Sequence, residues 1–398
     1  MAGTDSANRA EILVGERLDE LLDNYDQTAD PEWFWGRQYD LGLAWVHFEE
    51  GFGGLGVSPR HQVLVQERLS DAGAPTWNRE VNLLGIGMGA GVIATHGTTE
   101  QKQRWLRPMF TTEEIWCQLF SEPDAGSDLA NLSTRAVRDG DEWVVNGQKV
   151  WTTLAHIAKW GMLPARTDPD AKKHQGLTYF IVDMEATGVD VRPLYQITGE
   201  AEFNEVFFSD VRIPDAQRID QVGAGWRVAM STLMNERVAI GSRPIPRGGG
   251  SISTAVEMWR TYRHSDPGLR DELTRLWAAW EAMRLTNQRA GQMRQAGTPG
   301  PEGSTGKLVW ADLNKEVTEF TMELMGWDAT LYPGGYVLHR PDLSDEKTPQ
   351  RDFLRARANS IEGGTSEIMR NILGERVLGL PGEPRVDKDV PWKDVPRG

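Results

Sequence analysis

The period of the hydrophobic pattern changes twice along this chain, and these changes limit the folds that it can adopt. Apolar residues recur at helical spacing over 1–112, β-rich runs separated by turn residues dominate 113–222, and helical spacing returns over 223–398. Each stretch is long enough to bury a core of its own. The sequence therefore predicts an α+β protein with an N-terminal helical domain, a central β domain and a C-terminal helical domain.

Local signals within these stretches predict particular elements. Asn146-Gly147 lies between two runs of β-forming residues, and this dipeptide favours a tight hairpin because both turn positions prefer positive φ. Further β-rich runs lie at 177–182, 189–191 and 206–213. One face of a single helix gathers Trp226, Met230, Leu233, Met234 and Val238.

Charge and cysteine content narrow the function classes. The 43 Lys and Arg against 58 Asp and Glu leave a net charge of −15, which repels a phosphate backbone, so we expect no nucleic-acid partner. Cys117 is the one cysteine, and we expect it to be a small buried hydrophobe in a reducing compartment. The acidic N-terminus lacks a signal-peptide pattern, and the longest uncharged stretch, 81–95, is too short to cross a bilayer. We therefore expect a cytoplasmic protein without a membrane partner.

Three widespread functional motifs do not fit this chain. Residues 51–56 have the spacing of a dinucleotide-binding loop but lack the strand before it and the helix directly after it, so they are expected to form a structural turn. The seven histidines form no His-Glu-x-x-His group, and we expect no metal site. The absence of a Gly-x-Ser-x-Gly motif argues against the hypothesis that the chain is a serine hydrolase.

Two neighbouring segments carry the most chemical information. The first is 117–128, with Ser121 and Ser127 in a loop that contains proline and glycine, and the second is 146–153. Hydroxyls, exposed N–H groups and the Trp151 indole could hold a polar planar ligand, with the indole stacked beside it. Taken alone, such a loop is also what ordinary turn chemistry produces.

Taken together, these residues resemble the acyl-CoA dehydrogenase family. The family pattern is roughly Thr/Ser-Glu-Pro-x-Ala-Gly-Ser-Asp, then Asn-Gly-x-Lys-x-Trp-Ile-Thr and, near the C-terminus, Glu-Gly-Thr-x-x-Ile. The matching residues are 121–128, 146–153 and 364–368. The resemblance extends through nearly the whole chain, and three ordered motifs make it specific.

The resemblance implies a fold, a cofactor and a set of contacts. It implies a central antiparallel β domain and a C-terminal four-helix bundle, with FAD bound between them. The flavin pyrimidine would face the Phe120-Ser121 backbone and the Ser121 hydroxyl, while Trp151 would pack against the ring and Thr153 would bond near flavin N5. Ser127 would touch the phosphopantetheine of the substrate or the FAD phosphates. Near the FAD adenosine the matching positions are Thr365 and Glu367.

The reaction implied is removal of an α-proton from an acyl-CoA thioester with transfer of a β-hydride to flavin N5, which gives a trans-2-enoyl-CoA. It needs one carboxylate base with a raised pKa. Many relatives place this base in Glu-Gly-Thr, but here Gly363 occupies that position, with Glu362 one residue before it. The isovaleryl-CoA and long-chain branches instead place it directly before an arginine on the first helix after the β domain. That favours Glu236, with Arg237 near the substrate, and leaves Glu362 as the alternative.

Two departures from the family pattern concern the neighbouring subunit. The segments that in relatives read Arg-x-x-Phe-Gly and Gln-x-x-Gly-Gly-x-Gly here read 260–265 and 331–336 without a match. A homo-oligomer, dimer or tetramer, is the default, and a hetero-oligomer in which this chain is mainly structural or ligand-binding is the alternative.

The resemblance also implies a role in fatty acid metabolism, and an electron-transferring flavoprotein as the electron acceptor. A flavin monooxygenase on the same fold is disfavoured by Glu236.

Overall fold

The computed structural model describes most of the chain, which forms two compact units. The described residues are 2–23, 25–26, 30–75, 79–240, 245–262, 264–295, 302–333, 335–339, 348–385, 387 and 389–395. Unit 1 comprises Met1–Arg192, Asn204–Ala239 and Asp387–Gly398, and unit 2 comprises Pro193–Phe203 and Ile240–Val386.

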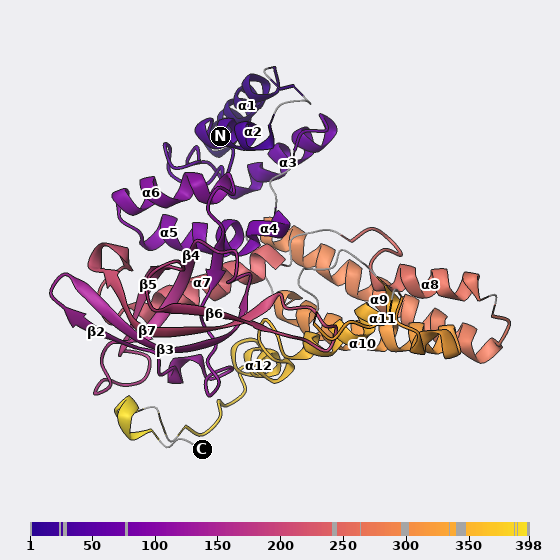
Figure 1. Ribbon diagram of the computed structural model, residues 1–398. Helices are drawn as coiled ribbons and strands as arrows, with labels where there is room; N and C mark the ends of the chain where they lie inside the picture. Colours follow the sequence, from indigo (N-terminus) through magenta and orange to yellow (C-terminus); the bar gives the residue numbers. More distant parts are fainter. Residues whose placement is uncertain are drawn as a thin grey trace. The chain divides into compact units, whose positions relative to one another are not determined.

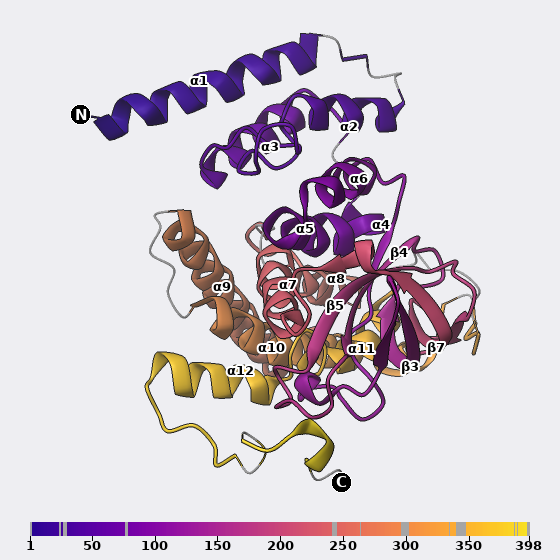
Figure 2. The ribbon, with the colours of Figure 1, turned by 90° about the vertical axis from the view of Figure 1, so that its left-hand side faces the viewer.

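Unit 1 begins with helices and continues into a sheet (Figures 1 and 2). Its helices are α1 (Ala2–Asp23), α2 (Pro31–Asp40), α3 (Gln62–Asp71), α4 (Arg79–Leu84), α5 (Ala90–His96), α6 (Thr99–Phe110) and α7 (Gly225–Ile240). Its strands are β1 (Trp116–Gln118), β2 (Arg135–Asp139), β3 (Glu142–Thr153), β4 (Trp160–Arg166), β5 (Leu177–Asp183), β6 (Val189–Leu194), β7 (Phe203–Pro214) and β8 (Arg218–Ile219).

The stretch 81–95 is helical but not one regular helix. A π-helix, Gly85–Gly89, separates α4 from α5, and its glycines let the backbone pack closely. Asn82 leaves helical geometry and uses its amide to donate to Met109 O and accept from Trp116 N. This segment thereby joins the N-terminal helices to β1.

The described strands form one sheet in the order β6-β7-β3-β2-β4-β5-β8, with β1 also paired to β4. The predicted β domain is confirmed, and in detail the sheet is mixed, because β4 pairs in parallel with β1 and β2 while β2–β3, β4–β5 and β5–β8 are antiparallel. All seven residues of β4 are buried, as expected of a central strand. Cys117 is fully buried, as expected.

The predicted hairpin at Asn146-Gly147 is wrong. Strand β3 runs straight through it, and the chain turns instead at 140–141, between Asp139 and its partner Glu142. Asn146 bonds Asp210 across the sheet. A Cβ at Gly147 would lie 2.7 Å from Thr134 Cα, so glycine is needed here for close strand approach rather than for a turn.

Helix α7 is confirmed, and its predicted face is confirmed in part, because Trp226 and Leu233 pack against the core of unit 1. Met234 is 63% exposed, whereas Val228, Ala229 and Thr232 are buried. The side chain of Val238 lies outside the described residues. Thr232 can be buried because its hydroxyl donates to Val228 O and is bonded to Tyr179 of β5.

Unit 2 is a helical bundle centred on α10 (Glu302–Met325), which packs against α8 (Ser251–Thr261), α9 (Pro267–Gln295), α11 (Pro349–Ala356) and α12 (Ser366–Ile372). Trp280, Val317 and Phe320 are central in its core. The predicted C-terminal helical bundle is confirmed, although α7, which precedes it in the sequence, packs in unit 1. The domain boundaries at 112 and 222 stay a prediction.

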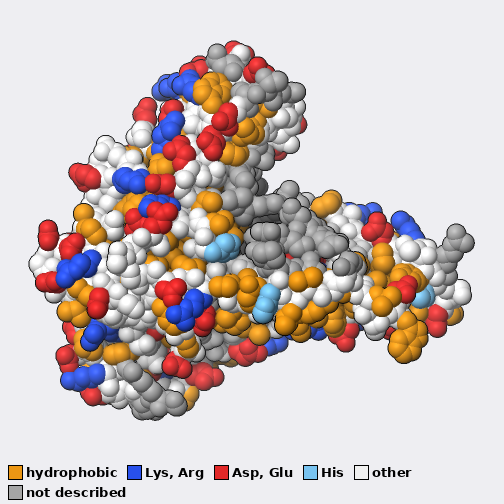
Figure 3. All heavy atoms as spheres, in the orientation of Figure 1, with side chains coloured by type: hydrophobic (Ala, Val, Ile, Leu, Met, Phe, Trp, Pro, Cys, Tyr) orange, Lys and Arg blue, Asp and Glu red, His pale blue; other side chains and the backbone are white. Residues whose placement is uncertain are grey.

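Three features of the described residues concern possible contacts with nucleic acid, membrane and metal: the distribution of surface charge, the character of the helices and the arrangement of side chains that bind metals. On the face drawn in Figure 3, acidic and basic side chains are interspersed among the described residues rather than separated into large patches of one sign. Among the described helices, none has the length and apolar character that crossing a membrane requires. No group of three or more described His, Cys, Asp and Glu side chains is arranged to hold a metal ion.

Candidate active site

A buried ion pair joins the two sequence motifs of the β domain. Lys149 of β3 is fully buried, and its ammonium lies 2.9 Å from Glu122 Oε1. Glu122 also accepts hydrogen bonds from the Ser133 N–H and hydroxyl and from the Thr134 N–H. Burial alone would raise the pKa of Glu122, but Lys149 and these donors lower it to about 2. Glu122 is therefore a fixed carboxylate rather than a proton acceptor.

The same pair sets the backbone of the predicted flavin-facing segment. Lys149 Nζ donates to Phe120 O at 3.0 Å and to Pro164 O at 3.2 Å, and Val150 N donates to Ser121 O at 2.9 Å. Both carbonyls of Phe120 and Ser121 are thus used inside the protein. A ligand would meet N–H groups and the Ser121 hydroxyl, which are donors that suit the carbonyl oxygens of a flavin pyrimidine.

The end of β3 carries the predicted stacking residue in an unusual backbone. Trp151 has φ +59° and Leu154 has φ +59°, although neither is glycine. Such left-handed conformations cost energy and gather at binding sites. Trp151 is 57% exposed, and Thr153, two residues later, is half-buried. An exposed indole on a strained backbone, beside the donors of Phe120 and Ser121, fits a planar flavin ring.

Ser127 lies in the exposed part of the first motif. Its neighbour Asp128 is held by Lys173, whose ammonium is 2.9 Å from both Asp128 oxygens. The structure therefore places Ser127 on a loop whose position is fixed at the next residue, while Ser127 itself stays at the surface.

Helix α7 brings the position of the predicted base toward the same part of the sheet. Tyr179 OH lies 3.0 Å from Thr232 Oγ1, and the Tyr179 ring packs edge-on against Phe120 at 6.1 Å between centroids. Position 236 follows Thr232 by four residues, one helical turn further along α7. The side chains of Glu236 and Arg237 lie outside the described residues.

The end of α5 is tied to α7 by a network with the spacing of a hydrolase triad. His96 lies 3.2 Å from Asp220 and 2.9 Å from Ser231 Oγ. Ser231 Oγ also donates to Arg227 O of its own helix, and Asp220 is paired with Arg227. We interpret it as an anchor between helices.

The C-terminal motif lies in unit 2 and has a structural explanation of its own. Thr365 is the N-cap of α12 and accepts from Ile368 N, while Glu367 is an exposed partner of Arg370.

The alternative base also lies in unit 2, next to a glycine with a constrained backbone. Glu362 is bound on one oxygen by Arg355 and on the other by Asn359, both at 2.8 Å. Gly363 has φ +62°, a conformation in which glutamate would be strained. The local backbone therefore suits the glycine that replaces the usual glutamate of the family.

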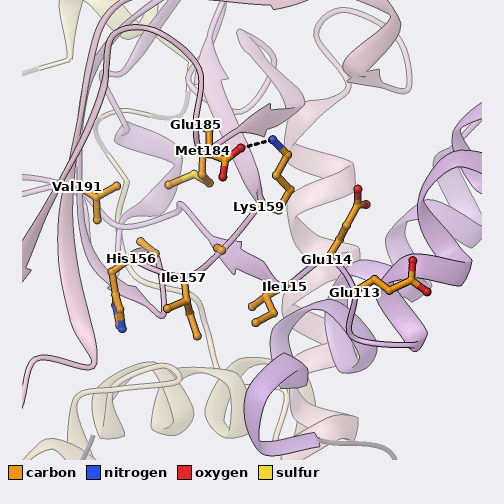
Figure 4. Close-up of a pocket in the computed structure, with 11 residues that line it drawn as sticks. Glu113, Glu114, Ile115, His156, Ile157, Lys159, Met184, Glu185 and Val191 are labelled. Atoms are coloured by element: carbon orange, nitrogen blue, oxygen red, sulfur yellow. Dashed lines mark hydrogen bonds and ion pairs between the residues drawn. The ribbon is translucent and has the colours of Figure 1, made fainter. Parts of the chain in front are cut away.

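One cavity in unit 1 is lined in part by residues that follow the end of β3 (Figure 4). It measures about 560 Å³, and its lining includes Ala155, two residues after Thr153. Ile157 and Val191 form part of the apolar lining, and Lys159 of the same lining is paired with Glu185 at 2.6 Å.

Sequence reasoning missed the residues that hold the site together. Glu122 and Lys149 belong to the motifs but were not assigned roles, and Tyr179 and Thr232 were not singled out. A signal existed only for Lys149, a charged residue within a run of β-forming residues.

Comparison with known proteins identifies the chain. The succession of helices, β-sheet and helical bundle along the chain is that of a family of flavoprotein oxidoreductases. Models of the acyl-CoA dehydrogenase N-terminal, middle and C-terminal domains match residues 7–113, 117–211 and 223–378. Acyl-CoA dehydrogenase IpdE1 of Mycobacterium tuberculosis is 40% identical over 350 residues, which are 86% of each chain. The protein belongs to the acyl-CoA dehydrogenase family and is an FAD-dependent oxidoreductase that acts on acyl-CoA.

Two solved structures illustrate the shared fold. The ChsE4–ChsE5 complex from Mycobacterium tuberculosis matches with a TM-score of 0.68 at 28% identity, over 94% of this chain and 98% of that one. A glutaryl-CoA dehydrogenase from Mycobacterium smegmatis, solved in complex with FADH2, matches with a TM-score of 0.67 at 20% identity, over 94% and 96% of the two chains.

Proposed function

We propose that this protein dehydrogenates an acyl-CoA thioester to the trans-2-enoyl-CoA, with Glu236 as the base that takes the α-proton. Bound FAD supplies the hydride acceptor, N5 of the flavin. The observation that carries the proposal is the α7 register: Thr232, one turn before Glu236, is bonded to Tyr179, whose ring contacts Phe120. The base position and the flavin-facing segment therefore belong to one packed framework.

The alternative base, Glu362, is less suited to proton transfer. Both of its oxygens are already bound, one by the Arg355 guanidinium and one by the Asn359 amide. A general base needs a lone pair directed at the substrate. Gly363, at the position that bears the base in many relatives, offers no carboxylate there to act as a base.

The remaining contacts are proposed on the resemblance and the geometry together. Phe120, Ser121, Trp151 and Thr153 would hold the flavin ring. Ser127 would meet a phosphate group of FAD or of the substrate, and Arg237 would lie near the substrate. The adenosine would be met by Thr365 and Glu367, and the Thr365 hydroxyl can donate to it while it caps α12.

Anaerobic titration of the FAD-loaded protein with a panel of short, branched, long and bulky acyl-CoAs tests the proposal. We expect one class to bleach the flavin absorbance, and Glu236→Gln to slow that bleaching about 10²- to 10⁴-fold because proton removal is lost. Glu362→Gln is the matched control and should keep the rate within about tenfold. Fast bleaching in Glu236→Gln together with slow bleaching in Glu362→Gln would assign the base to Glu362.

One observation on unit 2 favours a contact with another protein chain. Trp327 is 89% exposed, and Leu331, the first residue of the unmatched segment 331–336, is 66% exposed. Large apolar side chains at a surface are typical of a contact with another chain. A homo-oligomer is the default. ChsE4 and ChsE5 of Mycobacterium tuberculosis form a complex with each other, which supports a hetero-oligomeric subunit as the alternative.

Flavin content and mass of the chain purified alone separate these states. A yellow dimer or tetramer supports the homo-oligomer, whereas a colourless chain that FAD does not reconstitute supports the hetero-oligomeric subunit.

We further propose that the enzyme acts in fatty acid metabolism and passes electrons to an electron-transferring flavoprotein. We also propose that it acts in the cytoplasm, where its buried Cys117 needs no disulfide partner.

A further inference from the structure

A C-terminal segment, Asp387 together with 389–395, packs onto the β domain and is called the C-terminal strap here. Trp392 is 8% exposed, its N–H donates to Ala171 O at 2.9 Å, and its indole N–H donates to Asn131 O at 3.3 Å. Lys393 N donates to Pro169 O at 3.0 Å. The strap lies beyond residue 378, where the match to the C-terminal family domain ends.

The strap covers a buried arginine that organises the loop after Ser127. Arg166 is 2% exposed, and its guanidinium lies 4.6 Å from the centre of the Trp392 ring. It donates to Ala130 O at 2.6 Å and to Lys173 O at 2.7 Å. Because a guanidinium in this position has its donors directed at backbone carbonyls, it fixes the path of both segments.

Lys173 connects the strap to the motif loop directly. Its side chain is 7% exposed, and its ammonium is bonded to both oxygens of Asp128 and to Asp387 of the strap. Burial alone would lower the pKa of Lys173, but the two carboxylates raise it above its ordinary value, so the lysine stays charged. Charge-assisted hydrogen bonds of this kind hold geometry more firmly than neutral ones.

We propose that Lys173 and the C-terminal strap are positioning elements for a phosphate-binding loop at Ser127-Asp128. The strap and Arg166 fix the chain at 130–131, and Lys173 fixes it at Asp128, which leaves the Ser127 hydroxyl and neighbouring N–H groups for a pyrophosphate. That pyrophosphate belongs either to FAD or to the CoA of the substrate. The inference rests on the proposed function only in assigning Ser127 to a phosphate contact.

Two adjacent lysines provide a matched test. Lys172 pairs with Asp389 of the strap at the exposed rim, whereas Lys173 holds Asp128 as well as the strap. We expect Lys173→Met to weaken the binding of FAD or of CoA about tenfold, because a charge-assisted contact to the loop is lost. Lys172→Met should change the same affinity less than about twofold. A chain shortened after residue 386 should weaken binding in the same direction as Lys173→Met, and Lys173→Arg should restore most of the affinity.

Binding is measured in two arms that require no turnover, so that failure of the Glu236 assignment does not affect them. FAD is titrated into the flavin-free protein and followed by quenching of flavin fluorescence. CoA is titrated into the FAD-loaded protein and followed by calorimetry. A loss in the FAD arm assigns the loop to the cofactor, and a loss in the CoA arm assigns it to the substrate.

Three results would overturn the inference. They are unchanged affinity in both arms for Lys173→Met, equal losses for Lys172→Met and Lys173→Met, and unchanged affinity in the shortened chain. Thermal unfolding of every variant, recorded without ligand, separates a loss of affinity from a loss of folded protein.

Discussion

The two motif regions of this chain use their polar residues in opposite ways. In the β domain Glu122 is 5% exposed and Lys149 is fully buried, and together they fix backbone groups of three segments. In unit 2 the Glu367 side chain is 75% exposed and pairs loosely with Arg370 at 3.5 Å. A buried ion pair cannot lose one partner without leaving a bare charge, whereas an exposed pair exchanges its partner for water. Motif residues of one family therefore differ in what they contribute, and burial decides which.

The largest effect is expected when the buried ion pair loses its lysine, in the variant Lys149→Met. We expect it to destabilise the protein by about 3–5 kcal/mol, because Glu122 would be left as an unpaired buried carboxylate. Denaturant unfolding followed by tryptophan fluorescence measures the loss. The double variant Glu122→Met/Lys149→Met is the control and should lose less than Lys149→Met alone. A larger loss in the double variant would mean that the pair matters for packing volume and not for charge.

A second effect of similar origin is expected on acidification. Glu122 has a pKa depressed to about 2 in the folded protein, from an ordinary value of 4.5. Its ionised form therefore stabilises the fold above pH 4.5, and this contribution, about 3 kcal/mol, is lost as pH falls toward 2. Unfolding by urea at several pH values should show the stability gap between the wild type and Glu122→Gln narrowing over that interval. A gap that stays constant would contradict the depressed pKa.

The smallest effects are expected in unit 2. Thr365→Ala removes the N-cap of α12 and should cost about 1 kcal/mol, whereas Glu367→Gln should cost less than about 0.5 kcal/mol because its pair is exposed. Thermal unfolding of the two variants, with and without FAD, gives both numbers. If Thr365 also meets the adenosine, its variant alone should lose part of the stabilisation that FAD provides.

The sequence predicted the order of the domains and the existence of most elements, because hydrophobic period reflects which side of an element is buried. It misplaced the hairpin, since the preference of Asn146-Gly147 for a turn was outweighed by the pairing of β3 with β2. It predicted the buried face of α7 only in part: Trp226 and Leu233 pack against the core, but the burial of Thr232 depends on Tyr179, 53 residues away in sequence. Local patterns carry no information about such distant partners.

The site shows the same difference between residues that a local motif predicts and residues whose role depends on partners distant in sequence. A resemblance between motifs predicts Phe120, Ser121, Trp151 and Thr153 as flavin contacts, and the structure brings the segments that carry them together around Lys149. The ion pair that fixes these segments joins residues 27 apart in sequence and depends on how the strands meet. It could not be inferred from either motif alone.

The hydrogen bond from the Trp392 indole to Asn131 O has a consequence for how the protein is made. It joins residues 261 apart in the chain. At synthesis rates of about 5–20 residues per second, roughly 13–52 s pass between the emergence of the two partners. During that interval the strands of the β domain have been made, but the Trp392 ring that packs over Arg166 has not. Residues made late in synthesis therefore complete a domain that began to fold much earlier.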